Sequence, residues 1–181
     1  AWVVASMEVL LGTEGGGLDS KGYEEVLRPM FENFPECVEC LDALIHAAKP
    51  KWGGEAGEWE PFLRKKLEHA PEDVRARTYA LAVASIESYV IGLEKNYWET
   101  YGQEKVDKGL LKKGVDLLAA KYPDSRYVAN VEAVVFSKRI EDPKRAGAAL
   151  KRMTGVIDLG LWRDYGVYSH CTRWIASKMP Y

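Results

Sequence analysis

The sequence predicts an all-α fold of stacked antiparallel helical hairpins. In several segments apolar residues recur at positions i, i+3, i+4 and i+7, which places them on one stripe of a helix. Strand signals are scarce, because no run of alternating β-branched residues lies between hairpin turns. Prolines beside acidic residues repeatedly precede the periodic segments, as is typical of helix starts. The chain has 181 residues, of which 47% are hydrophobic, so we expect residues 1–181 to form a single helical-repeat domain.

Each helix is predicted from a periodic segment and the residues that bound it. The chain opens with an apolar helix, and three glycines at 15–17 predict the loop that follows. Pro35 and Pro71 mark the starts of later helices, and Asp142-Pro143 separates two helices by a tight turn. Short joints of this kind make consecutive helices antiparallel neighbours. The predicted helices span residues 1–11, 20–33, 36–49, 57–69, 72–98, 104–121, 126–140, 143–153 and 160–178.

The longest predicted helix, residues 72–98, is expected to lie at the centre of the domain, buried on two sides. One of its faces carries large apolar residues that step by four and three positions along the helix. These are Tyr79, Val83, Ile86, Val90, Leu93 and Tyr97. A second face carries Ala76, Ala80 and Ala84. Because these side chains are small, we expect a neighbouring helix to approach closely there.

The helix starts marked by proline are unevenly spaced. Pro35 and Pro71 are 36 residues apart, whereas Pro71 and Pro123 are 52 apart. A regular tetratricopeptide array would keep a period of about 34 residues. The spacing therefore predicts degenerate repeats with one long inserted helix, which is an irregular tetratricopeptide-like α–α superhelix.

Charge and composition exclude several classes of partner. The formal net charge is −2 and both signs are interspersed, so we expect neither nucleic acid nor an anionic membrane as a partner. No stretch approaches the roughly 18–20 apolar residues of a transmembrane helix. The chain begins at Ala1 without a start methionine, so we expect a fragment of a longer chain, and the sequence predicts no cellular location.

Cys37 and Cys40 are the sharpest candidates for chemistry. They fall in the first turn predicted after Pro35, and a helix N-terminus stabilises a thiolate. A dithiol oxidoreductase would need a preceding strand, and a zinc site would need Cys171 and a histidine such as His46 to converge on the pair. Three interpretations stay open: two small residues that pack on one side of a helix, a redox or disulfide pair, and a metal site.

The segment Pro50-Lys51-Trp52-Gly53-Gly54 is a second candidate. Adjacent glycines let a backbone approach an anion, but the segment matches neither the Walker nor the dinucleotide-binding pattern. The alternative is a sharp turn in which Trp52 fills the gap between two hairpins. We therefore take Trp52, Gly53 and Gly54 as interaction or structural-turn residues.

No catalytic, cofactor-binding or metal-ligating residue is predicted. Carboxylates are abundant, but Glu72, Asp73 and Asp124 are expected to be helix-start charges. The Glu-x-x-His pattern of helical diiron proteins is absent. The many aromatic residues are expected to fill gaps between helices, and those that remain exposed would mark a binding face.

Three segments resemble a bacterial family of helical, tetratricopeptide-like proteins, the one catalogued as domain of unknown function 4034. The shared positions are Pro50-Lys51-Trp52-Gly53-Gly54, then Gly109, Leu117, Lys121-Tyr122-Pro123-Asp124-Ser125 and Asn130, then Asp142, Ala146, Leu150, Trp162 and Cys171-Thr172-Arg173-Trp174-Ile175-Ala176. The resemblance covers roughly residues 34–176 and implies an all-helical superhelix without an assigned activity. Glu55 departs from it, since the family usually has a serine there that would cap the next helix.

Together these observations predict an uncharacterised bacterial helical-repeat protein that is not an enzyme and uses no cofactor. Stacked hairpins offer an extended surface, so the expected function is that of a scaffold that binds a protein or a peptide. The alternative function is a redox- or metal-responsive protein that uses Cys37 and Cys40.

Overall fold

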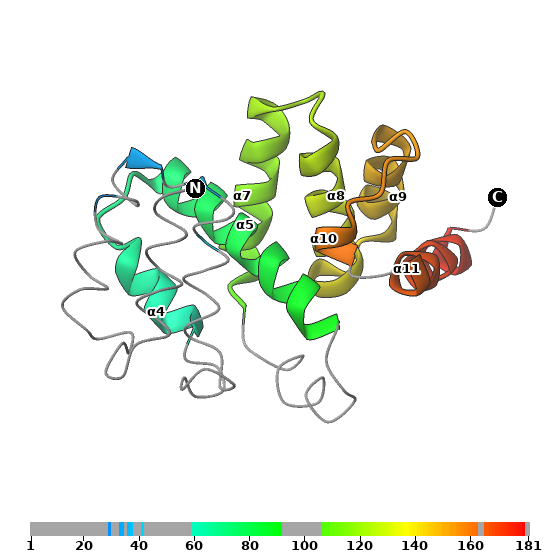
Figure 1. The fold of residues 1–181 in the computed structure, drawn as a ribbon, viewed down its shortest axis with the longest axis horizontal. Coiled ribbons are helices and arrows are strands. Elements are labelled where there is room, and N and C mark those ends of the chain that lie inside the picture. Colours follow the sequence, from blue (N-terminus) through cyan, green and yellow to red (C-terminus); the bar gives the residue numbers. More distant parts are fainter. Residues whose placement is uncertain are drawn as a thin grey trace.

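The computed structural model describes residues 59–91, 106–162 and 165–179, together with the single positions 29, 33, 34, 36, 37 and 41. Every regular element within these ranges is a helix (Figure 1), which confirms the predicted all-α class. The elements are α4 (Trp59–Lys66), α5 (Glu72–Ile91), α7 (Lys108–Lys121), α8 (Arg126–Val135), the π-helix η2 (Phe136–Ile140), α9 (Pro143–Arg152), α10 (Leu159–Trp162) and α11 (Tyr165–Lys178). In these ranges no helix combines the length and apolarity that crossing a membrane requires.

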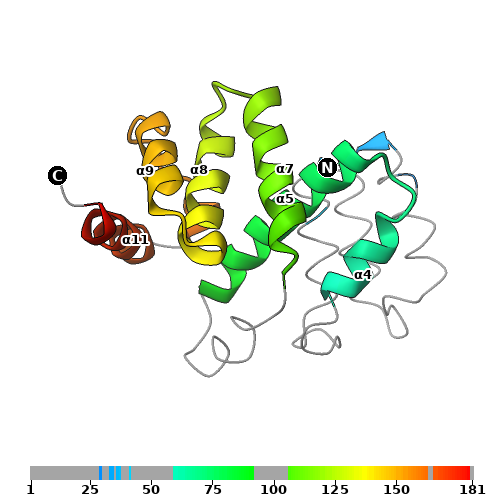
Figure 2. The same ribbon diagram turned by 180° about the vertical axis from the view of Figure 1, so that it is seen from behind.

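The described helices form an array of antiparallel neighbours. In Figure 1, α7, α8 and α9 stand side by side, and α5 runs obliquely across them. Residues 122–125 join α7 to α8, and residues 141–142 join η2 to α9, so each joint is short enough to force a reversal of direction. Figure 2 shows the same order from behind, with α4 at one end of the array and α11 at the other.

Helix α5 is the centre of this array, as its sequence predicted. Every residue from 76 to 87 is buried, so more than three turns of the helix have no solvent face. The small-residue face also behaves as expected. A Cβ placed on Gly114 of α7 would lie only 2.8 Å from the Cβ of Ala80 and would overlap the carbonyl group of Ala76. The two helices therefore approach closely because residue 114 has no side chain.

The starts of three helices are capped by Asp or Ser side chains. The side chains of Asp107, Ser125 and Asp142 each accept a hydrogen bond from a backbone N–H in the first turn of α7, α8 and α9, respectively. Pro143 occupies the first turn of α9, where its missing N–H leaves no hydrogen bond unmade. The predicted tight turn at Asp142-Pro143 is therefore confirmed.

The segment predicted as one helix at 126–140 ends in a π-helical turn. The backbone N–H groups of Glu141 and Asp142 both donate to the carbonyl of Phe136. The Ser137 hydroxyl donates back to the Val134 carbonyl at 3.1 Å and so competes for backbone acceptors in the same turn. Glu141 closes the turn in the left-handed region, at φ 61°.

Most helix boundaries agree with the sequence, with two corrections. The helix predicted to begin at residue 104 begins at Lys108, after its capping residue Asp107. The predicted helix at 160–178 is two helices, α10 and α11, which point in different directions (Figure 1). The division has a packing reason, because Trp162 at the end of α10 is buried and tied to Asn130, while α11 packs on α9. The predicted helices 1–11, 20–33 and 36–49 lie outside the described residues apart from single positions, and residues 92–98 of the long helix lie outside them entirely.

Candidate interaction site

The residues that the sequence singled out for chemistry lie mainly outside the described part of the chain. This applies to Cys40, His46, Trp52, Gly53 and Gly54. The redox or metal hypothesis for Cys37 and Cys40, and the turn hypothesis for residues 52–54, therefore stay predictions.

The described cysteines lie in separate environments. Cys37 is half-buried and packs against the core; its backbone N–H donates to the Phe34 carbonyl at 3.0 Å. Cys171 of α11 is 2% exposed, and its Sγ lies 3.6 Å from the Ser137 hydroxyl oxygen. Among the described residues, no group of three or more His, Cys, Asp or Glu side chains is arranged to hold a metal ion.

Glu36, the residue before Cys37, is the centre of a polar cluster. One carboxylate oxygen of Glu36 accepts hydrogen bonds from Arg77 Nε at 2.6 Å and from Lys121 Nζ at 3.0 Å. The other accepts a hydrogen bond from the Tyr122 hydroxyl at 3.2 Å. Arg77 also contacts Asp73 at 2.8 Å. Glu36 thereby ties its segment to the start of α5 and the end of α7.

The electrostatics of this cluster favour the ionised form of Glu36. Partial burial would raise the pKa of its carboxyl group, but the hydrogen bonds and charges of Arg77 and Lys121 outweigh burial and hold that pKa below its usual value. The ammonium group of Lys121 also lies over the ring of Tyr122, 5.1 Å from its centroid. Charge and ring contacts together orient Tyr122, which keeps 41% of its surface exposed.

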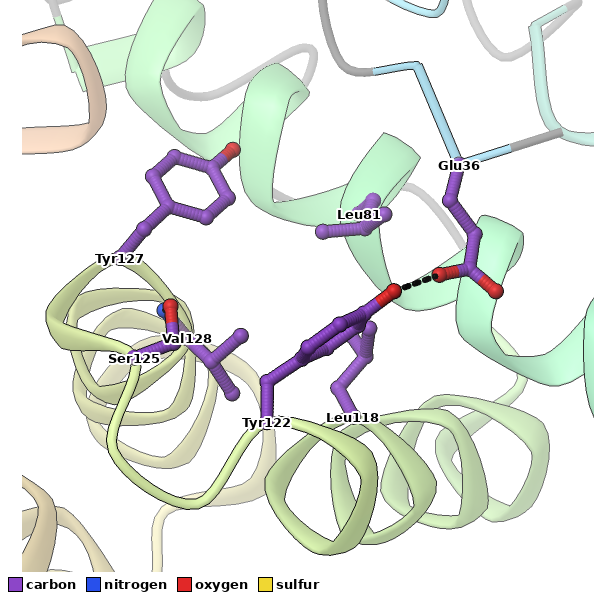
Figure 3. Close-up of a pocket in the computed structure, with 7 residues that line it drawn as sticks. All are labelled: Glu36, Leu81, Leu118, Tyr122, Ser125, Tyr127 and Val128. Carbon is purple, nitrogen blue, oxygen red and sulfur yellow. Dashed lines mark hydrogen bonds between the residues drawn. The ribbon is translucent and has the colours of Figure 1, made fainter. Parts of the chain in front are cut away.

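A cavity of about 210 Å³ opens beside this cluster (Figure 3). Its walls are the side chains of Leu81 from α5, Leu118 from α7 and Val128 from α8, all of them apolar. The rings of Tyr122 and Tyr127 frame it, as the close-up shows. Glu36 and Ser125 complete the lining. The arrangement is an apolar floor with polar groups at the rim.

A second, more polar cavity of about 290 Å³ lies between η2 and α11. It is lined by Ser137, Lys138, Glu141, His170, Cys171 and Trp174. Cys171 and His170 both contribute to it, but the hydrogen bond described for the Cys171 thiol is with Ser137 and not with the imidazole. A nucleophilic cysteine needs a base within hydrogen-bond reach, so these two residues do not form a catalytic pair in this arrangement.

The Glu36 cluster and the first cavity were not predicted. In the sequence, Lys121 and Tyr122 belong to the family-like motif, and Glu36 is an acidic residue beside Pro35. Glu36 lies 41 residues from Arg77 and 85 from Lys121 along the chain. No local spacing marks contacts over such separations, so the sequence carried no signal for them.

No family model, curated protein or solved structure matches this chain. Its function is therefore inferred from the geometry of its own residues.

Proposed function

We propose that this protein is a non-catalytic helical scaffold that binds a protein or peptide partner and takes one apolar side chain of that partner into the cavity framed by Tyr122 and Tyr127. The observation that carries the proposal is this cavity, which has an apolar floor and an exposed aromatic residue at its rim. We also propose that the fold is an irregular tetratricopeptide-like superhelix, as the resemblance of its motifs to the bacterial family implies.

The size of the cavity supports an anchor side chain over a small-molecule ligand. Small-molecule sites usually occupy about 300–1,000 Å³. The cavity measures about 210 Å³, which is below that range and suits one large side chain. Protein interfaces concentrate their binding energy in such anchors, where an aromatic or aliphatic group fills a desolvated pocket.

The rim of the cavity supports the same function. Tyr122 presents an exposed ring, and its orientation is held by Glu36 and Lys121 rather than by a partner. An aromatic ring that is already oriented loses little conformational freedom on binding. Tyr122 is therefore the residue that we expect to contribute most to the affinity.

Selection of random peptides on the immobilised protein tests the proposal. We expect the selected peptides to share an aromatic or aliphatic anchor. Tyr122→Ala should weaken their binding by about tenfold, the effect of losing a hot-spot contact of roughly 1.4 kcal/mol. Tyr122→Phe should weaken binding by less than about threefold, because it keeps the ring and its contact with Lys121 and loses only the hydrogen bond to Glu36.

Tyr165→Ala is the matched control, because Tyr165 is also an exposed tyrosine, 66% accessible, but lies on α11. It should bind the selected peptides as the wild type does. The proposal fails if no peptide is enriched, or if Tyr165→Ala weakens binding as much as Tyr122→Ala does.

A further inference from the structure

Charge is distributed unevenly along this chain. Residues 143–181 contain seven Lys or Arg residues and two Asp residues, so this segment carries a formal charge of +5. The whole chain carries −2, so residues 1–142 carry −7. The near-neutral total therefore conceals a basic C-terminal segment, and such an asymmetry indicates a charged partner.

The positive charge is concentrated on α9 and on the end of α11. Helix α9 contains two lysines, two arginines and no acidic residue. Lys144, Ala148 and Lys151 are exposed and fall at i, i+4 and i+7, so they share one face of this helix. Lys144 and Lys151 form no ion pair with any residue in the described ranges. Their ammonium groups are thus available to a partner.

The end of α11 adjoins this face. A Cβ placed on Gly147 of α9 would lie 2.7 Å from the Met179 side chain and 3.4 Å from Ile175. Gly147 lies between Lys144 and Lys151 along α9, and Lys178 of α11 precedes Met179 and is exposed. We define Lys144, Lys151 and Lys178 as the basic surface.

Two of the acidic residues near the basic surface are engaged in structural contacts, whereas Glu141, which precedes α9, is exposed. Asp142 caps the start of α9 by accepting from the Arg145 N–H at 3.0 Å. Glu132 of α8 accepts from Arg145 at 2.7 Å and also pairs with Arg152. Glu132 and Asp116 therefore pair with the two arginines of α9, whereas the two lysines form no ion pair within the described residues.

We propose that the basic surface docks a short acidic segment of a protein partner; this inference rests on the scaffold function proposed above. Charge complementarity is the basis, since two lysines on one face of α9 and a third on α11 match closely spaced carboxylates. Helix α9 has ten residues and is about 15 Å long, which about five residues of an extended peptide would span.

The net charge of the chain favours a short acidic peptide over nucleic acid. A nucleic acid carries its negative charge along its whole length. The whole chain carries a formal charge of −2, so it offers a long polyanion no net attraction. An acidic peptide limited in length needs only the local positive charge of the basic surface.

Fluorescence anisotropy with a labelled peptide of about eight residues, alternating Glu and Ser, tests this inference. The peptide should bind the wild-type chain at about 0.05 M salt and about tenfold more weakly at about 0.5 M, because salt screens exposed charges. Lys144→Glu combined with Lys151→Glu should weaken binding by at least about tenfold.

The control variant combines Lys65→Glu with Lys108→Glu. These lysines are exposed on α4 and α7, and the variant changes the net charge by the same amount. It should weaken binding less than about threefold. Thermal unfolding followed by circular dichroism checks that both double variants remain folded.

Three outcomes overturn the inference: the peptide does not bind, the control variant weakens binding as much as the basic-surface variant, or a single-stranded oligonucleotide of equal charge binds more tightly than the peptide. The Tyr122→Ala variant separates the two proposals. If the selected anchor peptides bind through Tyr122 and the acidic peptide does not bind at all, the basic surface fails and the scaffold function stands.

Discussion

Where α5 crosses α7, the closest approach is between small apolar residues, whereas α8 contacts α10 and the segment before it through a buried polar side chain. At the crossing, Gly114 lies against Ala76 and Ala80 with no space for another carbon atom. At the other contact, Asn130 is 1% exposed, and both the nitrogen and the oxygen of its side-chain amide form hydrogen bonds. Its nitrogen donates to the Val156 carbonyl at 3.1 Å, and its oxygen accepts from the Trp162 indole at 2.8 Å.

This difference determines how each region responds to substitution. A close apolar crossing tolerates no added volume, because a packed interior has no space to accommodate it. A buried hydrogen-bonded residue tolerates no loss of its polar atoms, because the partners then remain unsatisfied. The first region should thus be sensitive to size and the second to polarity.

Gly114→Ala should have the largest effect, lowering the free energy of unfolding by about 3 kcal/mol. The added methyl group would collide with the Ala76 backbone, which cannot move without shifting α5. Urea unfolding measures the change. Gly109→Ala in the same helix is the control, since its Cβ would meet only the Asp107 side chain, at 3.3 Å. An equal loss in both variants would contradict the steric explanation.

Asn130→Ala should have the next largest effect, lowering the free energy of unfolding by about 2 kcal/mol. The substitution leaves the Trp162 N–H and the backbone N–H of Asp158 without their acceptor. The same unfolding experiment measures it. Asn33→Ala is the comparison. The side-chain amides of Asn130 and Asn33 each donate to a carbonyl four residues earlier, but Asn33 is exposed, so its replacement should lower the free energy of unfolding by less than about 0.5 kcal/mol.

Glu36→Gln should lower the free energy of unfolding by about 1 kcal/mol near neutral pH, because Arg77 and Lys121 lose a charged acceptor. The pKa of Glu36 is lowered in the folded state, so its contribution is complete above the ordinary carboxyl pKa and is lost as the pH falls toward the lowered value. Unfolding measured across this acidic window should show a shallower pH dependence in the variant. A variant with the wild-type pH dependence would exclude Glu36 as a source of it.

Glu87→Gln should have the smallest effect below the ordinary carboxyl pKa, within about 1 kcal/mol of unfolding free energy, because Gln there replaces an uncharged carboxyl group and keeps an oxygen that accepts from Arg139. Glu87 is 1% exposed, and burial raises its pKa. The folded state then holds this proton more tightly than the unfolded state. The wild type should therefore lose stability as the pH rises from the ordinary to the raised pKa, and the variant should not. If the wild type instead gains stability over this pH range relative to the variant, the pKa of Glu87 is not raised in the folded state.

Much of the described fold could be predicted, because the signals that place helices are local. Asp142-Pro143 started a helix as expected, and the alanine face of α5 received a neighbouring helix as expected. The division of residues 160–178 was not predicted, since it depends on Trp162 reaching Asn130, 32 residues away. For the same reason the cavity beside Glu36 was not predicted, as its lining comes from separate segments of the chain.

The basic surface could be predicted from the sequence only in part. The charge of residues 143–181 is written in the sequence, and counting charges segment by segment would have revealed it. Which of these cations remain available was decided by packing, because Glu132 pairs with Arg145 and Arg152 but not with Lys144 or Lys151.

By itself, the sequence determined the helical class, the start of α9 at Asp142-Pro143 and the small-residue face of α5 that receives a neighbouring helix. These follow from interactions between residues a few positions apart, which the order of amino acids specifies directly. Only the tertiary structure decided which carboxylate meets which cation and where a cavity remains. Those contacts join residues tens of positions apart, and they exist only once whole helices have packed.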